Sequence, residues 1–176
     1  KENIKDISNN FKYILDSRKT WWYIASCRTK ERFSRTILGG FWLGISNSSF
    51  VIALSLVYGI VFQVTDFKEF FIYLGLGITG WNYISTTSLA APELFSKNQP
   101  QINNTNNKHI YYVMEEWAFQ LQTFLQSLLL ILLFLSFFKF DIFLKFLSFG
   151  IPPLLNLILF CFWFPLLISI LGIRYR

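Results

Sequence analysis

Four long stretches without a single Asp, Glu, Lys or Arg constrain this chain of 176 residues more than any other feature. They are residues 37–64, 70–92, 117–138 and 146–173. Each exceeds the roughly 20 residues that cross a bilayer as an α-helix. Lipid offers no hydrogen-bond partners, so a spanning segment must satisfy its own backbone as a helix. We therefore expect an all-α, polytopic protein with four transmembrane helices.

The composition excludes an ordinary soluble domain and gives no sign of catalysis. With 53% hydrophobic and 15% charged residues, the chain has too little polar surface for a globule of this length. Cys27 and Cys161 suggest neither a disulfide framework nor a metal site. No phosphate-binding loop ends in Gly-Lys-Ser/Thr, and the single His109 cannot be placed in a catalytic triad. We expect no catalytic residue and no bound metal or cofactor in this chain.

The basic residues indicate how the spans are oriented. If the N-terminus lies in the cytoplasm, thirteen of the sixteen Lys and Arg residues fall on the cytoplasmic side, as the positive-inside rule requires. We therefore expect a multi-pass protein of the cytoplasmic membrane with its N-terminus inside. The net charge of +6 follows from this topology and suits anionic lipid headgroups. It does not call for a nucleic-acid partner.

Residues 1–36 predict a separate element ahead of the transmembrane domain at 37–176. Apolar side chains recur there at helical spacing among polar ones, which is typical of an amphipathic helix on the membrane surface. These apolar residues are Ile4, Ile7, Phe11, Ile14 and Leu15. The aromatic cluster Trp21, Trp22 and Tyr23 suits headgroup depth, so we expect it to anchor this segment at the interface.

Three arginines just before the first span share one face of a helix. Arg28, Arg32 and Arg35 follow one another at spacings of four and three. Guanidinium groups suit phosphate oxygens, so the cluster could receive the headgroup of a substrate. Simple anchoring of the first span by positive charge explains the same residues. Both interpretations stay open at this point.

Polar side chains inside the spans are candidates for lining a conduit. Thr79, Asn82 and Thr86 share one face of the second span, and Gln122 and Gln126 share one face of the third. Hydrogen bonds between neighbouring helices would explain them equally well. The four runs contain no charged residue, which counts against proton- or sodium-coupled transport. In the fourth run Pro165 predicts a bend.

The loop at residues 93–116 is long for a simple connection. Its first part predicts a short helix with Pro92 in the first turn and an exposed Leu94–Phe95 pair that could dock into another protein. The candidate docking residues are Glu93, Leu94, Phe95, Ser96, Lys97, Asn98 and Gln99.

Three stretches, in order, resemble the permeases of type-2 ATP-binding-cassette transporters. They are RFSRTILGGFW at 32–42, FIYLGLGITGWNYIS at 71–85 and GIRYR at 172–176. The likeness is closest to exporters of lipid-linked polysaccharide such as O-antigen, capsule or teichoic acid. It implies a homodimer of permeases with separate ATPase subunits that bind ATP and Mg. It also implies a coupling helix at residues 93–99 and a substrate entrance at the three arginines.

The resemblance has two departures. The family usually has a Phe-Pro pair after the coupling helix, where this chain reads KHIYYVMEE at 108–116. The family also has six spans, so we expect this chain to be a fragment with four of them.

The leading hypothesis is export of a lipid-linked glycan, driven by ATP hydrolysis in a partner subunit. The alternatives are a membrane scaffold or assembly protein without transport activity, and an exporter of a lipid or a drug. A transferase acting on polyprenyl phosphates is a further class, for which Glu115 and Glu116 would be the adjacent acidic pair.

Overall fold

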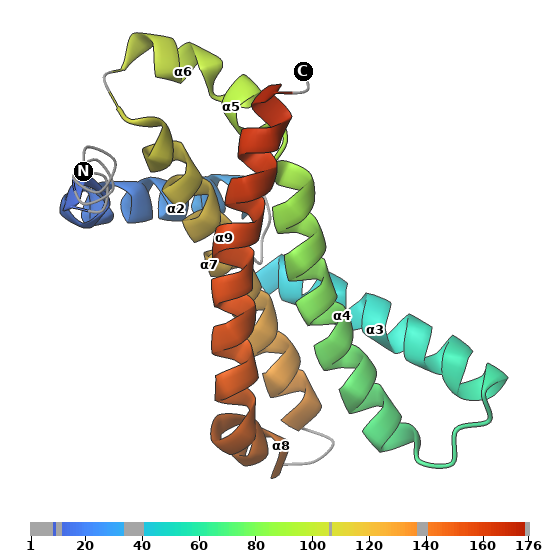
Figure 1. The fold of residues 1–176 in the computed structure, drawn as a ribbon. Coiled ribbons are helices and arrows are strands. Elements are labelled where there is room, and N and C mark those ends of the chain that lie inside the picture. Colours follow the sequence, from blue (N-terminus) through green and yellow to red (C-terminus); the bar gives the residue numbers. More distant parts are fainter. Residues whose placement is uncertain (1–8, 10–11, 34–40, 106, 137–140, 175–176) are drawn as a thin grey trace.

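The computed structural model describes residues 9, 12–33, 41–105, 107–136 and 141–174. These residues form helices joined by short connections, and no strand occurs among them. The all-α prediction is therefore confirmed for the described part of the chain. Figure 1 shows several long helices running side by side, with one helix lying across them.

Four long helices overlap the four uncharged runs, and the third begins eight residues before its run, inside the loop predicted at residues 93–116. They are α3 (Phe41–Val61), α4 (Phe67–Ala90), α7 (His109–Ser136) and α9 (Ile151–Arg174). Helix α7 is central, because it packs against α3, α4, α9 and the crossing helix. The core between α3, α4, α7 and α9 is apolar, with Val51, Ile131 and Leu135 fully buried. The apolar character that predicted the helices therefore also supplies their packing.

Two of the described helical stretches are long and apolar enough to cross a membrane. These are His109–Ser136 and Phe143–Gly172. In α3 the described apolar stretch is shorter and covers Ile45–Val61. Helix α4 is 24 residues long but carries Thr79, Asn82 and Thr86. Length and composition thus support two membrane-spanning helices in the described residues rather than the four expected from the uncharged runs.

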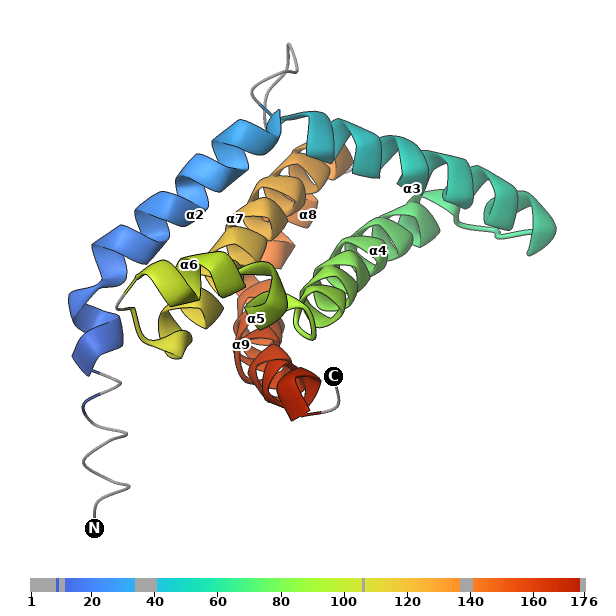
Figure 2. The ribbon, with the colours of Figure 1, turned by 90° about the horizontal axis from the view of Figure 1, so that it is seen from above.

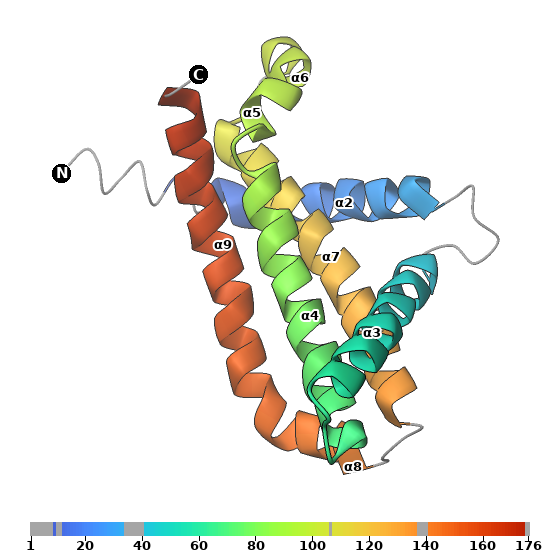
Figure 3. The ribbon, with the colours of Figure 1, turned by 90° about the vertical axis from the view of Figure 1, so that its right-hand side faces the viewer.

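Helix α2 (Arg18–Phe33) runs across the long helices, as Figures 1 and 3 show. Its buried residues Trp21 and Ala25 pack against α7. Trp22 and Tyr23, by contrast, are exposed. The aromatic cluster is therefore divided, with one ring in the protein core and two at the surface. Of the predicted amphipathic positions before α2, Ile14 and Leu15 lie in a helical stretch, while Ile4, Ile7 and Phe11 lie outside the described residues.

The connection between α3 and α4 is short, and two local features shape it. Gln63 adopts a left-handed conformation, with φ of 49°, where the chain leaves α3. The Asp66 side chain caps α4 by accepting a hydrogen bond from the backbone N–H of Glu69 at 3.4 Å. At the same end of the molecule, α8 (Asp141–Lys145) and the π-helix η1 (Phe146–Gly150) lead into α9. Helix α9 continues through Pro165, and Figure 3 shows the chain turning where α8 leads into α9.

The opposite end carries α5 (Leu94–Lys97), α6 (Gln99–Asn104) and the C-terminal end of α9 (Figures 1 and 2). Helix α5 packs against α7 and α9. A Cβ atom added to Gly172 would lie 2.8 Å from the carbonyl oxygen of Pro92, so glycine permits this close approach. The docking segment predicted from the sequence therefore rests on the helix bundle.

Candidate functional site

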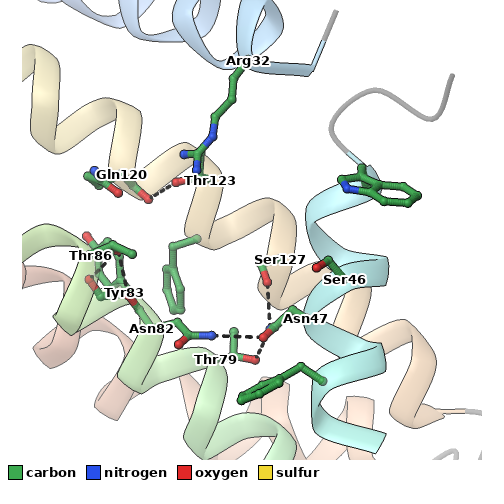
Figure 4. A pocket seen from close by; sticks show the side chains of 13 residues that line it. Arg32, Ser46, Asn47, Thr79, Asn82, Tyr83, Thr86, Gln120, Thr123 and Ser127 are labelled. Carbon is green, nitrogen blue, oxygen red and sulfur yellow. Dashed lines mark hydrogen bonds between the residues drawn. The ribbon is translucent and has the colours of Figure 1, made fainter. Parts of the chain in front are cut away.

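A cleft of about 610 Å³ lies between α3, α4 and α7, with the last turn of α2 at its rim (Figure 4). Its size is within the range of pockets that bind small ligands, about 300–1,000 Å³. Eight of its lining side chains are polar and uncharged: Ser46, Asn47, Thr79, Asn82, Thr86, Gln120, Thr123 and Ser127. Four are aromatic: Trp42, Phe50, Tyr83 and Phe124.

Asn47 joins the three helices at the floor of the cleft. Its Nδ2 donates to Thr79 Oγ1 on α4 at 3.0 Å and to Ser127 Oγ on α7 at 3.2 Å. Its Oδ1 accepts a hydrogen bond from Asn82 Nδ2 at 3.1 Å. Figure 4 shows these side chains converging from α3, α4 and α7. This network both fixes α3 on its neighbours and presents amide and hydroxyl groups to the cleft.

Aromatic rings complete the wall. Tyr83 stacks on Phe124, with ring centroids 4.3 Å apart and an interplanar angle of 14°. Both residues are buried, so the stack also belongs to the core between α4 and α7. Trp42 on α3 is exposed and lines the cleft. Ligand sites usually combine aromatic side chains with a few polar groups that fix the ligand's orientation, and this cleft has a larger share of polar groups.

Arg32 is the single charged side chain among the described residues that line the cleft. It belongs to the last turn of α2, and Figure 4 shows it reaching from that helix towards Thr123. Its guanidinium carbon lies 6.0 Å from the centre of the Phe119 ring on α7. The cleft therefore combines a neutral polar interior with one positive charge at its rim.

Arg28, one helical turn earlier, has different surroundings at the α2–α7 junction, the contact between these two helices. Its Nη1 donates to Glu115 Oε1 at 3.0 Å and its Nη2 donates to Glu116 Oε2 at 2.8 Å. The guanidinium also lies over the Phe119 ring, 4.5 Å from its centre. Partial burial alone would lower the pKa of Arg28, but Glu116 and Glu115 outweigh it and hold the pKa above its ordinary value. Arg28 is therefore paired within the chain.

The five predicted conduit residues do not share one location: three line the cleft, one lies at the α2–α7 junction, and one belongs to neither region. Thr79, Asn82 and Thr86 line the cleft. Gln122 instead faces α2, where its Nε2 donates to Ser26 Oγ at 3.0 Å and its Oε1 accepts from Thr29 Oγ1 at 3.3 Å. Gln126 is exposed and does not belong to the cleft lining.

The sequence interpretation missed the α3 and α7 sides of the cleft. Gln120, Thr123 and Ser127 recur at spacings of three and four, which places them on one face of α7. That spacing could have identified them. Asn47 belongs to the polar run Ser46–Ser49 inside an otherwise apolar stretch, which is also a visible signal. Arg35, the third arginine of the predicted entrance, lies outside the described residues.

The predicted docking segment needs one correction. Leu94 is buried, with 6% of its surface exposed, and Phe95 is half-buried with its ring 5.9 Å from that of His109. An apolar pair in a polar loop buries itself against α7 and α9 when those surfaces are within reach. The exposed members are Glu93, Ser96, Lys97 and Gln99. Asn98 is partly buried and donates its Nδ2 to the Leu94 carbonyl at 2.9 Å.

Comparisons with known proteins give no family. No family model, no curated protein and no solved structure matches this chain. The resemblance to exporter permeases therefore stays a prediction from the sequence. Among the described residues, no three His, Cys, Asp or Glu side chains lie grouped so that they could hold a metal ion.

Proposed function

We propose that this chain is the permease subunit of an ATP-driven exporter that moves lipid-linked polysaccharide across the bacterial cytoplasmic membrane. The observation that carries the proposal is the cleft between α3, α4 and α7, with its neutral polar interior and Arg32 at its rim. Amide and hydroxyl groups can exchange hydrogen bonds with sugar hydroxyls, and aromatic rings can cover the apolar faces of sugars. The guanidinium of Arg32 suits a phosphate group.

A membrane location would explain the large exposed apolar surface of the protein. Helix α9 carries a row of exposed apolar side chains: Leu155, Leu159, Trp163, Leu167, Ile170 and Leu171. In water such a row would be an aggregation hazard, whereas in a membrane the apolar lipid tails would cover it. We propose that α3 and α4 also cross the membrane. The polar residues that reduce the apolar character of α4 include three that line the cleft, so lipid need not contact those side chains.

The proposed orientation places the N-terminus in the cytoplasm. Helix α2, α5, α6 and the C-terminal end of α9 lie towards one end of the bundle, and the short α3–α4 connection and α8 lie at the other (Figure 1). The first end is the one that the sequence places inside from its excess of Lys and Arg. Helix α2 would then lie near the inner membrane surface, crossing the spans as an interfacial helix does.

The energy source would be a separate ATPase subunit, with ATP and Mg bound there. The exposed side chains of the α5–α6 segment at the cytoplasmic end are the proposed contact, and a second copy of the permease would complete the assembly. Because α5 packs on α7 and α9, a displacement of α5 by the ATPase would be transmitted to both of these helices. Such coupling would let ATP hydrolysis alternate the cleft between two states.

The test is purification of the tagged full-length protein from native membranes in mild detergent, with ATP hydrolysis and subunit masses measured on the eluate. Leu94 is buried, so its substitution would unpack the bundle. We therefore choose Lys97→Glu, an exposed charge reversal on α5. The matched control is Lys68→Glu, also exposed but located at the start of α4 at the opposite end.

We expect an ATPase to co-elute with the native protein and the Lys68→Glu variant, and to be reduced by Lys97→Glu. Loss of the ATPase in both variants would place the contact elsewhere. If no ATP-hydrolysing subunit accompanies a monodisperse native protein, the exporter proposal fails. The membrane scaffold would then be the better interpretation, since it needs no energy source.

A further inference from the structure

Arg28 and Arg32 are neighbours on one face of α2, yet their guanidinium groups have different partners. Arg28 is held by the carboxylates of Glu115 and Glu116, whereas Arg32 lines the cleft. Both guanidinium groups lie near one ring, that of Phe119, at 4.5 Å and 6.0 Å. The two arginines therefore lie near the same ring of α7, but Arg28 belongs to the α2–α7 junction and Arg32 belongs to the cleft.

The surroundings of Arg28 make it a poor receptor for an anionic headgroup. Two carboxylates balance and exceed its single positive charge, and they would repel a phosphate that approached it. Two of its N–H donors are already committed at 3.0 Å and 2.8 Å. Two charge-assisted hydrogen bonds from one guanidinium to two partly buried carboxylates fix geometry more strongly than an exposed ion pair does.

Glu116 connects this pairing to the cleft. Its Oε2 accepts from Arg28, and its Oε1 accepts a hydrogen bond from Gln120 Nε2 at 2.9 Å. Gln120 is one of the polar residues that line the cleft. Glu116 also lines a small cavity with Leu94 of α5 at the contact between α4, α7 and α9. The Glu116 carboxylate therefore contacts Arg28 of α2 and Gln120 in the cleft wall, and it borders the cavity beside Leu94 of α5.

We infer that Arg28 is a positioning residue: its clamp on Glu115 and Glu116 fixes α2 across α7 and so places Arg32 at the rim of the cleft. The inference rests on the proposed function only in treating the cleft as the ligand site. Releasing Arg28 would let the last turns of α2 move and would carry Arg32 away from the polar wall. Arg28 itself does not contact the ligand.

The position of α2 can be measured directly by electron-spin distance measurement on full-length protein in detergent micelles. Spin labels are placed at Lys30 on α2 and Lys68 on α4, both exposed, after Cys27→Ser and Cys161→Ala substitution. We expect one narrow distance distribution in this background. Arg28→Gln should broaden it at least roughly twofold, and Arg28→Lys, which keeps one charge but loses the fork, should give an intermediate width. Arg18→Gln, an exposed arginine on the same helix, should leave it narrow.

The charge swap Arg28→Glu with Glu116→Arg separates positioning from general damage. It restores an opposite-charge pair across the same junction, so the distribution should narrow again relative to Arg28→Glu alone. An unchanged distribution in Arg28→Gln, or no narrowing in the swap of a monodisperse protein, would overturn the inference.

Binding of farnesyl pyrophosphate, a short polyprenyl pyrophosphate probe, gives the second readout. Arg28→Gln should lower the affinity for the probe and also broaden the distance distribution between Lys30 and Lys68. The charge swap should restore part of the affinity and part of the narrow distribution. If Arg28→Gln weakens binding while the distance distribution stays narrow, Arg28 contacts the ligand and the inference is wrong. If no variant, including the parent, binds the probe, the proposed ligand site fails, while the distances still decide whether Arg28 holds α2.

Discussion

The α2–α7 junction and the cleft are both polar, but they differ in what their polar groups contact. At the junction, Arg28 is paired with Glu115 and Glu116, and Gln122 is bonded to Ser26 and Thr29. In the cleft, Asn47 forms hydrogen bonds with Thr79 and Asn82, and these side chains also border a cavity of about 610 Å³. Buried polar groups that find all their partners within the protein stabilise an arrangement of helices. Polar groups beside open space can serve a ligand.

The difference teaches that polarity within an apolar bundle does not by itself mark a transport path. Thr29 and Gln120 are both buried, and both belong to the hydrogen-bonded surroundings of α7. Only Gln120 lines the cleft. The comparison predicts that changes at the junction act first on stability, and on binding only through the position of α2, while changes in the cleft act on binding directly.

The largest expected effect is on stability at the junction. Arg28→Gln leaves two partly buried carboxylates without their cation, and removal of one partner from a buried pair costs about 3 kcal/mol. The melting temperature in detergent should fall accordingly. It can be followed by the reaction of a fluorescent maleimide with the buried thiol of Cys161 in a Cys27→Ser background. Arg18→Gln is the control, and equal melting temperatures for the two variants would contradict the clamp.

Arg32→Gln should have the opposite pattern of effects: a large loss of ligand affinity and little loss of stability. Hydrogen bonds to charged groups contribute about 1.5–3 kcal/mol, so its affinity for farnesyl pyrophosphate should fall roughly tenfold to a hundredfold. Its melting temperature should stay close to that of the parent, because Arg32 is exposed. Equilibrium binding in detergent and the Cys161 melting assay measure both quantities on one sample. A large loss of stability with unchanged affinity would remove Arg32 from the ligand site.

The four helices could be located from the sequence because a long uncharged run depends only on composition. The boundaries of α4 at Phe67–Ala90 and α9 at Ile151–Arg174 lie within a few residues of the runs themselves. The orientation of side chains was harder, since helical spacing shows which residues share a face but not which neighbour the face meets. The crossing of α2 over α7 decides that Gln122 bonds to Ser26, and this crossing is a tertiary property.

The site was predictable only in part for the same reason. Thr79, Asn82 and Thr86 share a face of α4, and that face borders the cleft. Arg28 and Arg32 look alike in the sequence because both are basic residues before the first span. Their difference comes from Glu115 and Glu116, which lie far along the chain and meet Arg28 only in the folded protein. Leu94 was misjudged because the surfaces of α7 and α9 that cover it are also distant in sequence.

Asn47→Leu probes the floor of the cleft, where the two roles overlap. The substitution removes two donated hydrogen bonds and one accepted from Asn82. Hydrogen bonds between membrane helices contribute on average about 0.6 kcal/mol each, so stability should fall by about 1–2 kcal/mol. Ser49→Ala is a suitable control, because the Ser49 hydroxyl donates to the Ile45 carbonyl of its own helix. Stability equal to the control would show that Asn47 does not hold α3.

The smallest expected effect is a difference in stability between variants of Gln122 and Gln126, which the sequence places on the same helix face. Gln122→Leu loses the bonds to Ser26 and Thr29 and should destabilise the protein by about 0.6–1.2 kcal/mol. Gln126→Leu changes an exposed side chain and should leave stability within about 0.5 kcal/mol of the parent. Neither residue lines the cleft, and Arg28 still holds α2 in both variants, so farnesyl pyrophosphate affinity should be unchanged. If Gln126→Leu weakened binding while Gln122→Leu did not, the ligand path would extend along α7 beyond the cleft, and the division between a stabilising junction and a binding cleft would have to be redrawn.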